Sequence, residues 1–165
     1  MKKRIAHRNL PQVFLRAREC LMSHFRPILN HFGLTEQQWR ILRVLDENEQ
    51  LEPREMCQLC QITSPSMTGV LARMEEMQLI LRSRVSEDQR RIMVRLAKKG
   101  DRLMAELAPL IEAQYQHIEQ ALGTQMFRDL STALEAFIAA ESHPVERIAL
   151  PAKAKVVAKR RAARL

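Results

Sequence analysis

Apolar residues in the first part of the chain recur at three- and four-residue spacings, which is the period of an amphipathic helix. One such run extends from Leu10 to about Phe32, and Gly33 is suited to end it. Thr35 and Gln38 then form a capping box, which opens a second helix that carries Trp39. Two helices are therefore predicted within the first fifty residues.

Two shorter helices are predicted next. Proline is favoured in the first turn of a helix, so Pro53 marks the start of one helix, and Ser64 followed by Pro65 marks the start of another that runs to Met77. The apolar residues of the latter helix recur at helical spacing and should line its buried face: Met67, Val70, Leu71 and Met74.

The pattern then changes from a helical to an alternating period. Ile92, Val94 and Leu96 alternate with their neighbours as in a strand, and residues 79–85 can pair with them across the polar turn 86–90. After Gly100 the helical period returns, ends near Gly123 and resumes behind Thr124.

These elements predict a mainly α fold with a small β-hairpin wing. Few glycines and many Leu, Met, Ala, Glu and Arg residues agree with a helical protein. Three short helices followed directly by a hairpin make a winged helix-turn-helix, which we assign to residues 35–96. In this motif the later helix enters the major groove of double-stranded DNA.

The outward face of the helix that starts at Ser64 suits that role. Small residues let the backbone approach base edges, hydroxyl groups can bond bases or phosphates, and the helix N-terminus favours phosphate. The candidate DNA-binding residues on this face are Ser64, Pro65, Ser66, Thr68, Gly69 and Arg73. An ordinary amphipathic helix with a small polar face is the alternative interpretation.

The hairpin carries five arginines, Arg82, Arg84, Arg90, Arg91 and Arg95, against two acidic residues, Glu87 and Asp88. An arginine at a hairpin tip can enter the minor groove, and a nearby aspartate can orient its guanidinium group. Arg90 and Asp88 are spaced for these two roles, and Arg91 is a third candidate DNA-binding residue. The alternative is a solvated turn that is rich in charge.

The net charge of +8 arises at the two ends of the chain. Residues 1–9 form a basic arm and residues 143–165 a basic tail that we expect to be disordered, which leaves residues 9–142 near −2. The bulk charge therefore says little about DNA binding by the folded domain. Three cysteines, no signal-peptide pattern and no apolar run long enough for a membrane span predict a soluble, cytoplasmic protein without a membrane partner.

The segment Asp88-Gln89-Arg90-Arg91, following residues 64–84, resembles the wing signature of the multiple-antibiotic-resistance regulator (MarR) family. Leu34-Thr35-Glu36-Gln37-Gln38-Trp39-Arg40, with residues 25–27 before it and 66–71 after it, resembles the members of that family that regulate homoprotocatechuate (4-hydroxyphenylacetate) degradation operons. The resemblance covers residues 10–140. It implies a homodimer held by helices in residues 10–34 and 97–142, which represses a catabolic operon and is released by an aromatic acid. The basic tail after Pro144 departs from the family pattern, as does His24, where an aromatic residue is more usual.

The effector site implied by this resemblance lies where the first predicted helix meets the second. A small aromatic carboxylate needs an apolar wall and a fixed cation, which Trp39 and Arg16 would supply, while Ser23 or His24 would bond a ring hydroxyl. The alternative is that Trp39 is plain core and Arg16 belongs to a solvated face.

Other functions are less well supported by the residues. Cys57 and Cys60 form one C-x-x-C pair without a second pair or suitably spaced histidines, so we expect packing rather than a metal site. Cys20, four residues from Arg16, keeps open a thiol-based oxidation sensor of the same fold. A third hypothesis is a nonspecific architectural protein that binds DNA through its basic ends. No catalytic constellation or phosphate loop is present in the sequence, so we expect neither an enzyme nor a cofactor.

Overall fold

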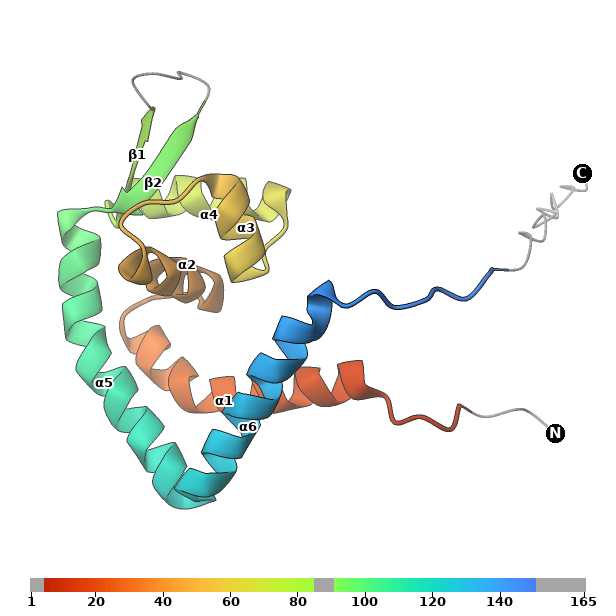
Figure 1. Ribbon diagram of the computed structural model, residues 1–165. Coiled ribbons are helices and arrows are strands. Elements are labelled where there is room, and N and C mark those ends of the chain that lie inside the picture. The colour runs from red at the N-terminus through yellow and green to blue at the C-terminus, as the bar shows by residue number, and fades with distance from the viewer. Residues whose placement is uncertain (1–4, 85–90, 151–165) are drawn as a thin grey trace, which may run out of the picture. The chain divides into compact units, whose positions relative to one another are not determined.

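A computed structural model describes residues 5–84 and 91–150 of the chain (Figure 1). It divides into two compact units, Met1–Gly123 and Thr124–Leu165, which are described separately. The first unit contains α1 (Leu10–His31), α2 (Glu36–Glu47), α3 (Pro53–Cys60), α4 (Ser64–Glu76), β1 (Ile80–Arg84), β2 (Ile92–Leu96) and α5 (Lys98–Leu122). The second contains α6 (Thr124–Ala139) and the short 3-10 helix η1 (Ala140–Ser142).

The central element of the first unit is α2, which packs against α1, α3, α4, α5 and β2. Ile41 and Leu42 are completely buried in this core. The predicted capping box is present: the Thr35 hydroxyl accepts a hydrogen bond from the Gln38 backbone, and the Gln38 side chain accepts one from the Thr35 backbone at 2.9 Å. The Gln38 amide also donates to the Met77 sulfur at 3.4 Å, so this buried polar side chain is satisfied at both ends.

The helix-turn-helix is formed by α3 and α4. Pro53 occupies the first turn of α3, and the helix ends at Cys60 because Gln61 adopts the left-handed conformation (φ 50°). The chain then enters α4, whose buried residues are the four that the periodicity predicted: Met67, Val70, Leu71 and Met74.

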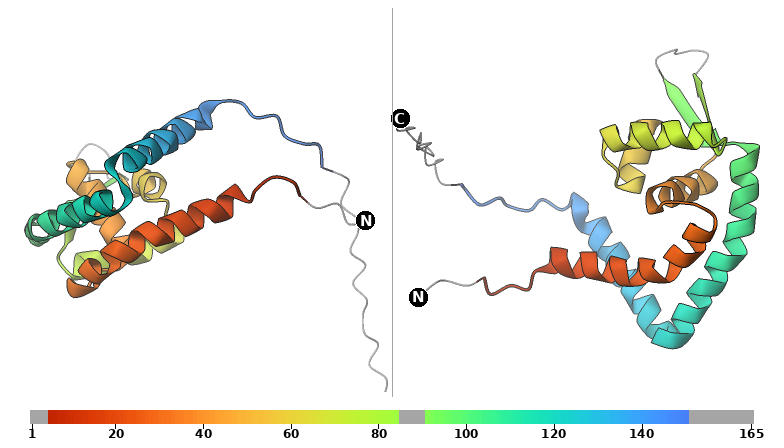
Figure 2. Two further views of the ribbon diagram at one scale, coloured as in Figure 1. Left: turned by 90° about the horizontal axis from the view of Figure 1, so that it is seen from below. Right: turned by 180° about the vertical axis from the view of Figure 1, so that it is seen from behind.

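The predicted hairpin is confirmed. β1 and β2 are antiparallel, with Ile80 opposite Leu96 and Arg84 opposite Ile92. Both Figure 1 and the right-hand view of Figure 2 show the hairpin extending from the helices, with α4 leading to its base. A further backbone bridge, which the sequence analysis did not predict, joins Leu51 to Val94: each N–H donates to the other's carbonyl, at 3.0 and 2.9 Å. It ties the segment between α2 and α3 to the wing.

The helix predicted after Gly100 begins two residues earlier, at Lys98, so Gly100 lies in the first turn of α5. Its backbone packs against the carbonyl of Leu79, and a Cβ added at Gly100 would overlap that oxygen. The Leu79 carbonyl also accepts a hydrogen bond from the Ala97 backbone at 3.0 Å. The absence of a side chain at Gly100 therefore allows α5 to start directly against the end of α4 and the wing.

In the second unit, no residue of α6 is buried, although the helix carries large apolar side chains. Residues 143–150 are exposed and form neither helix nor strand. The other part of the predicted basic tail, 151–165, lies outside the described residues. Among the helices that the structure describes, none is long and apolar enough to cross a membrane.

We predict that Gly100→Ala destabilises the protein because the new methyl group would collide with backbone rather than with a movable side chain. Overpacking of this kind costs about 1–3 kcal/mol. The matched control is Gly69→Ala, in the middle of α4, where an added Cβ would meet only Arg73 Nη1 at 4.0 Å. This control should gain stability by roughly 0.5–1 kcal/mol. Urea unfolding of both variants checks the prediction, and equal effects would contradict it.

Candidate DNA interface and effector site

The outward face of α4 is polar and accessible, as the sequence predicted. Ser64, Pro65, Ser66, Thr68 and Arg73 are exposed, and Gly69 is half-buried. The Thr68 hydroxyl donates to the Ser64 carbonyl at 3.1 Å, so its hydrogen is already used. The Ser66 hydroxyl accepts from the Thr63 hydroxyl at 3.1 Å and can still donate its own hydrogen. This face therefore combines small residues with at least one available hydroxyl donor.

Arg40 holds the turn that leads into this face. From α2 its Nη1 donates to the Cys60 carbonyl at 2.5 Å, and the Gln61 carbonyl lies 3.4 Å away. These are the last carbonyls of α3, which have no partner within the helix. The Arg40 Nε is buried without a hydrogen-bond partner among the described residues, so the guanidinium is positioned by the hydrogen bonds of Nη1. Arg40 was not among the residues predicted for the site.

Two ion pairs fix the wing to the helices. Arg82 of β1 donates from Nε to Glu75 of α4 at 2.8 Å, and this hydrogen bond lowers the pKa of Glu75. Arg91, just before β2, donates from Nε to Glu52 at the start of α3 at 2.6 Å. Arg91 was predicted to bind DNA; its pairing with Glu52 adds a structural role.

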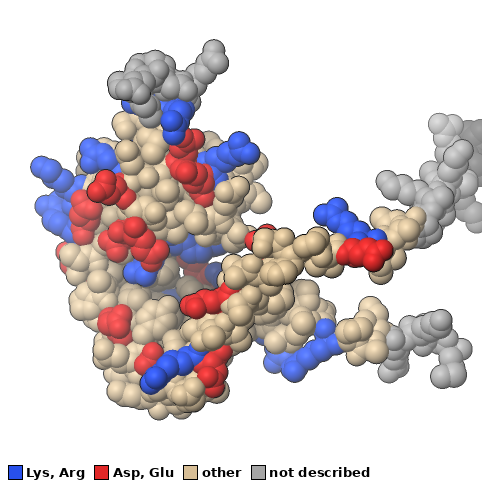
Figure 3. Space-filling view, viewed as in Figure 1, with Lys and Arg blue, Asp and Glu red and all other residues tan. Residues whose placement is uncertain are grey.

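The wing tip, with the predicted DNA-binding residues Asp88 and Arg90, lies outside the described residues. In the face that Figure 3 presents, basic side chains lie on the hairpin directly beneath the grey tip, and acidic side chains lie below them. Arg84 and Arg95 are exposed on the described part of the strands. The local positive charge of the wing therefore does not depend on its tip alone.

The residues predicted for the effector site have different surroundings. Trp39 is buried in α2, with 8% of its surface exposed. Arg16, Ser23 and His24 are exposed on α1, and the Ser23 hydroxyl donates to the Cys20 carbonyl at 2.7 Å. Among the described residues, the cation–π contact with Trp39 is made by a residue other than Arg16.

The cation that lies at Trp39 is Arg43, one helical turn further along α2. Its guanidinium carbon is 5.9 Å from the centroid of the indole ring. Arg43 also pairs with Glu47 at 2.8 Å, an exposed contact that contributes little by itself. An aromatic pair, Phe25 of α1 and Tyr115 of α5, has ring centroids 4.6 Å apart. The spacing of Trp39 and Arg43 on one helix could have identified this cation from the sequence.

Known proteins resemble this chain in both sequence and fold. The MarR family model matches residues 34–92, from the start of α2 into the wing. The homoprotocatechuate degradative operon repressor of Escherichia coli is 40% identical over 133 residues, which cover 81% of this chain and 90% of that protein. This chain belongs to the MarR family. The HTH-type transcriptional regulator FarR of Neisseria gonorrhoeae is 38% identical over 131 residues, or 78% of this chain and 90% of FarR.

A solved structure extends the match to the fold. NadR in complex with 4-hydroxyphenylacetate is 36% identical, with a TM-score of 0.73, and the match covers 83% of this chain and 97% of NadR. The named relatives are transcriptional regulators, and the protein is accordingly a MarR-family transcriptional regulator of winged-helix fold rather than an enzyme.

In this MarR-family regulator an ion-pair cluster joins α1 to α2. Arg26 donates to Glu36 at 2.6 Å and to Glu19 at 2.9 Å, and Arg18 also donates to Glu36 at 2.6 Å. The hydrogen bonds from Arg26 lower the pKa of both carboxyl groups below their ordinary value of 4.5. The cluster fixes the end of α1 against the start of α2.

The cysteines have three different surroundings. Cys60 is buried, and this burial raises the pKa of its thiol, which disfavours the reactive thiolate. Cys57 is half-buried and Cys20 is exposed. No group of three or more potential metal ligands is present among the described residues. The packing role predicted for Cys60 agrees with its burial, whereas oxidation sensing by exposed Cys20 stays a hypothesis.

We predict that the Arg26→Gln variant loses less of its free energy of unfolding than the parent when the pH is lowered. Because Glu19 and Glu36 have lowered pKa values in the folded protein, their contribution is present above about pH 4.5 and is lost as the pH falls through the folded values. Urea midpoints of the parent and the variant should converge as the pH is lowered from 7 to 3. Arg128→Gln, an exposed change on α6, is the control. Its urea midpoint should fall between pH 7 and pH 3 by as much as that of the parent. Parallel curves for the parent and Arg26→Gln would contradict the prediction.

Proposed function

We propose that the protein is a homodimeric repressor that binds a pseudo-palindromic operator, controls the catabolism of an aromatic acid such as homoprotocatechuate or 4-hydroxyphenylacetate, and is released by an aromatic carboxylate. The observation that carries the proposal is the exposed polar face of α4 beside a basic wing, held in position by Arg40 and by the Arg82–Glu75 pair. The E. coli relative is named as an operon repressor, which supports the same role here.

In this proposal α4 enters the major groove and the wing lies against the adjacent backbone or minor groove. Ser66 and Arg73 would contact phosphates or base edges, and half-buried Gly69 would let the helix approach closely. The guanidinium of Arg73 lies along the helix near Gly69, since a Cβ there would be 4.0 Å from Nη1. Arg90, and Asp88 with it, would contact DNA from the wing tip.

Dimerisation through residues 10–34 and 97–142 is supported by apolar surface at both ends of the described chain. Leu10 and Leu15 on α1 are 52% and 62% exposed, and Leu130 and Ile138 on α6 are 48% and 67% exposed. An amphipathic helix such as α6, with no residue buried in its own chain, is expected to bury its apolar face against a partner. A two-fold dimer would present two α4 helices to successive major grooves, about 34–36 Å apart.

The effector would lie against Trp39, between α1 and α2. The ring of an aromatic carboxylate would pack on the apolar and aromatic wall. Its carboxylate would pair with the Arg43 guanidinium and displace Glu47 from it. The sequence-based assignment of Arg16 to this role stays a prediction, as do the contacts of Ser23 and His24 with a ring hydroxyl. NadR, a 36% identical protein, has been solved with 4-hydroxyphenylacetate, which supports this class of ligand.

The two halves of the proposal are linked through α2. Trp39 and Arg43 would meet the effector, while Arg40 of the same helix holds the turn that precedes α4. A ligand that changes the position of α2 would therefore change the spacing of the two α4 helices in the dimer. Its effect is limited by its preference for the non-binding arrangement over the DNA-binding one.

We predict that Arg73→Ala and Arg90→Ala each weaken operator binding by about 1–3 kcal/mol and reduce the slope of affinity against salt concentration by about one. Asp88→Ala should act in the same direction but more weakly, because it orients an arginine rather than contacting DNA. Fluorescence anisotropy with operator and random duplexes at several salt concentrations measures both quantities. Arg128→Ala serves as the control for loss of a surface charge. Unchanged affinity in Arg73→Ala would exclude the outer face of α4 from the interface.

We predict that 4-hydroxyphenylacetate or its 3,4-dihydroxy form binds the protein and dissociates it from the operator. Arg43→Ala should retain DNA affinity and lose calorimetric binding of the ligand, because the carboxylate loses its charged partner. Arg16→Ala, measured in parallel, tests the sequence-based assignment. If Arg16→Ala loses ligand binding while Arg43→Ala retains it in full, Arg16 and not Arg43 pairs with the carboxylate. Absence of binding by any aromatic acid would leave only the DNA-binding half of the proposal.

A further inference from the structure

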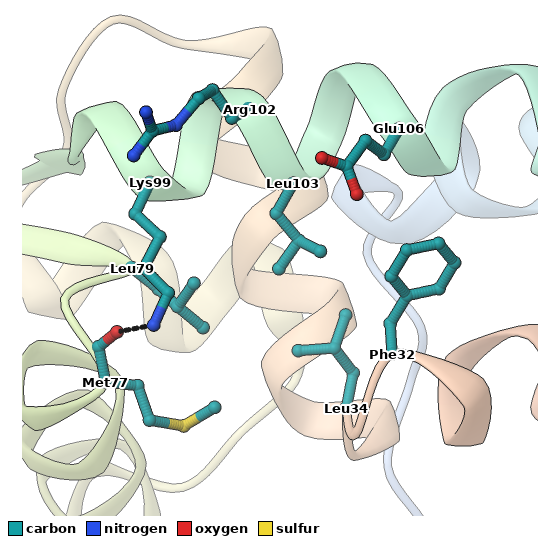
Figure 4. Close-up of a pocket in the computed structure, with 8 residues that line it drawn as sticks. All are labelled: Phe32, Leu34, Met77, Leu79, Lys99, Arg102, Leu103 and Glu106. Atoms are coloured by element: carbon teal, nitrogen blue, oxygen red, sulfur yellow. Dashed lines mark hydrogen bonds between the residues drawn. The ribbon is translucent and has the colours of Figure 1, made fainter.

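A cavity of about 270 Å³ lies on α5 (Figure 4), and neither Trp39 nor any other residue assigned to the effector lines it. Its walls are mostly apolar and come from three segments. Phe32 and Leu34 belong to the turn between α1 and α2, Met77 and Leu79 to the turn between α4 and β1, and Leu103 to α5. The volume is just under the roughly 300 Å³ at which pockets for drug-sized ligands begin. It therefore suits a ligand with one ring or a short chain.

The charged groups of this cavity lie on α5, at opposite ends. Figure 4 shows Lys99 and Arg102 at one end and the Glu106 carboxylate at the other, with Leu103 between them. Arg102 and Glu106 are four residues apart, a spacing at which helical ion pairs form, yet the two are not paired and each has no other ion-pair partner among the described residues. Their charges remain available to a ligand.

Lys99 connects the cationic end to the C-terminal end of α4. Its Nζ donates to the Met77 carbonyl at 2.9 Å, at the C-terminal end of α4, and an ammonium group has two further hydrogens. Met77 in turn accepts the hydrogen bond from buried Gln38 at the start of α2. The cavity thus lies where α5, α2 and the end of α4 meet.

We propose that this cavity is a second small-molecule site, which takes a monocarboxylate whose far end carries a hydrogen-bond donor. The carboxylate binds Arg102, and the Lys99 ammonium, held at the Met77 carbonyl, adds a second positive charge at this end of the cavity. The apolar body lies on Leu34, Leu79 and Leu103, and a hydroxyl group at the far end donates to Glu106. A second carboxylate at the far end is repelled by Glu106. Binding here would tie the end of α4 to α5, and it does not require the effector site at Trp39 to exist.

The test uses 4-hydroxybenzoate as the probe and terephthalate, which has a carboxylate in place of the hydroxyl, as its counterpart. In the full-length protein with ¹³C-methyl methionine, the Met77 signal, assigned with Met77→Leu, should shift on titration with 4-hydroxybenzoate but not with terephthalate. Arg102→Gln should weaken this response about tenfold or more, as expected for loss of a charge-assisted hydrogen bond. Lys98→Gln removes a neighbouring exposed charge that does not line the cavity and should leave the response unchanged.

The decisive variant is Glu106→Gln, which should let terephthalate shift the Met77 signal and weaken the response to 4-hydroxybenzoate. Arg43→Ala should leave all of these responses intact, which separates this site from the one at Trp39. The proposal is overturned if the Met77 signal does not respond to 4-hydroxybenzoate or if Arg102→Gln responds like the parent. It is also overturned if Glu106→Gln distinguishes 4-hydroxybenzoate from terephthalate as strongly as the parent does.

Discussion

Burial of α2 on several sides is the constraint on which the rest of the structure depends. Its apolar residues pack simultaneously against α1, α3, α4, α5 and the wing, so none of these elements can move without repacking it. The polar group buried in this core, Gln38, is satisfied by the Thr35 backbone and the Met77 sulfur, which fixes the start of the helix as well as its sides. α2 packs against α4 and also carries the proposed effector residues Trp39 and Arg43.

Charged side chains determine how the surrounding elements attach to this core. Arg40 binds the last carbonyls of α3, Arg82 pairs with Glu75 between the wing and α4, and Arg26 bridges α1 to α2. Many acidic residues are therefore engaged by arginines within the fold. This explains why residues 9–142 can have a net charge near −2 and still present exposed arginines on α4 and the wing. For DNA binding, the position of each charge matters more than the sum.

Local rules predicted most of the elements. The capping box at Thr35, the proline at the start of α3 and the four buried residues of α4 depend on interactions within one or two helical turns, so short segments of sequence are sufficient. The hairpin was predicted because its alternation is local as well. The helical period was predicted to return after Gly100, whereas α5 begins at Lys98 and includes Gly100 in its first turn, where the backbone packs against Leu79.

The sequence by itself therefore determined the fold class, the inward and outward faces of α4 and the family to which the chain belongs. The tertiary structure decided which distant residues meet: the bridge between Leu51 and Val94, the contact of Arg40 with the end of α3, and the cavity that α5 shares with two turns. These pairings join residues that are far apart in the chain, and no periodicity within either partner encodes them. They arise because the same apolar core has to be covered from several directions at once.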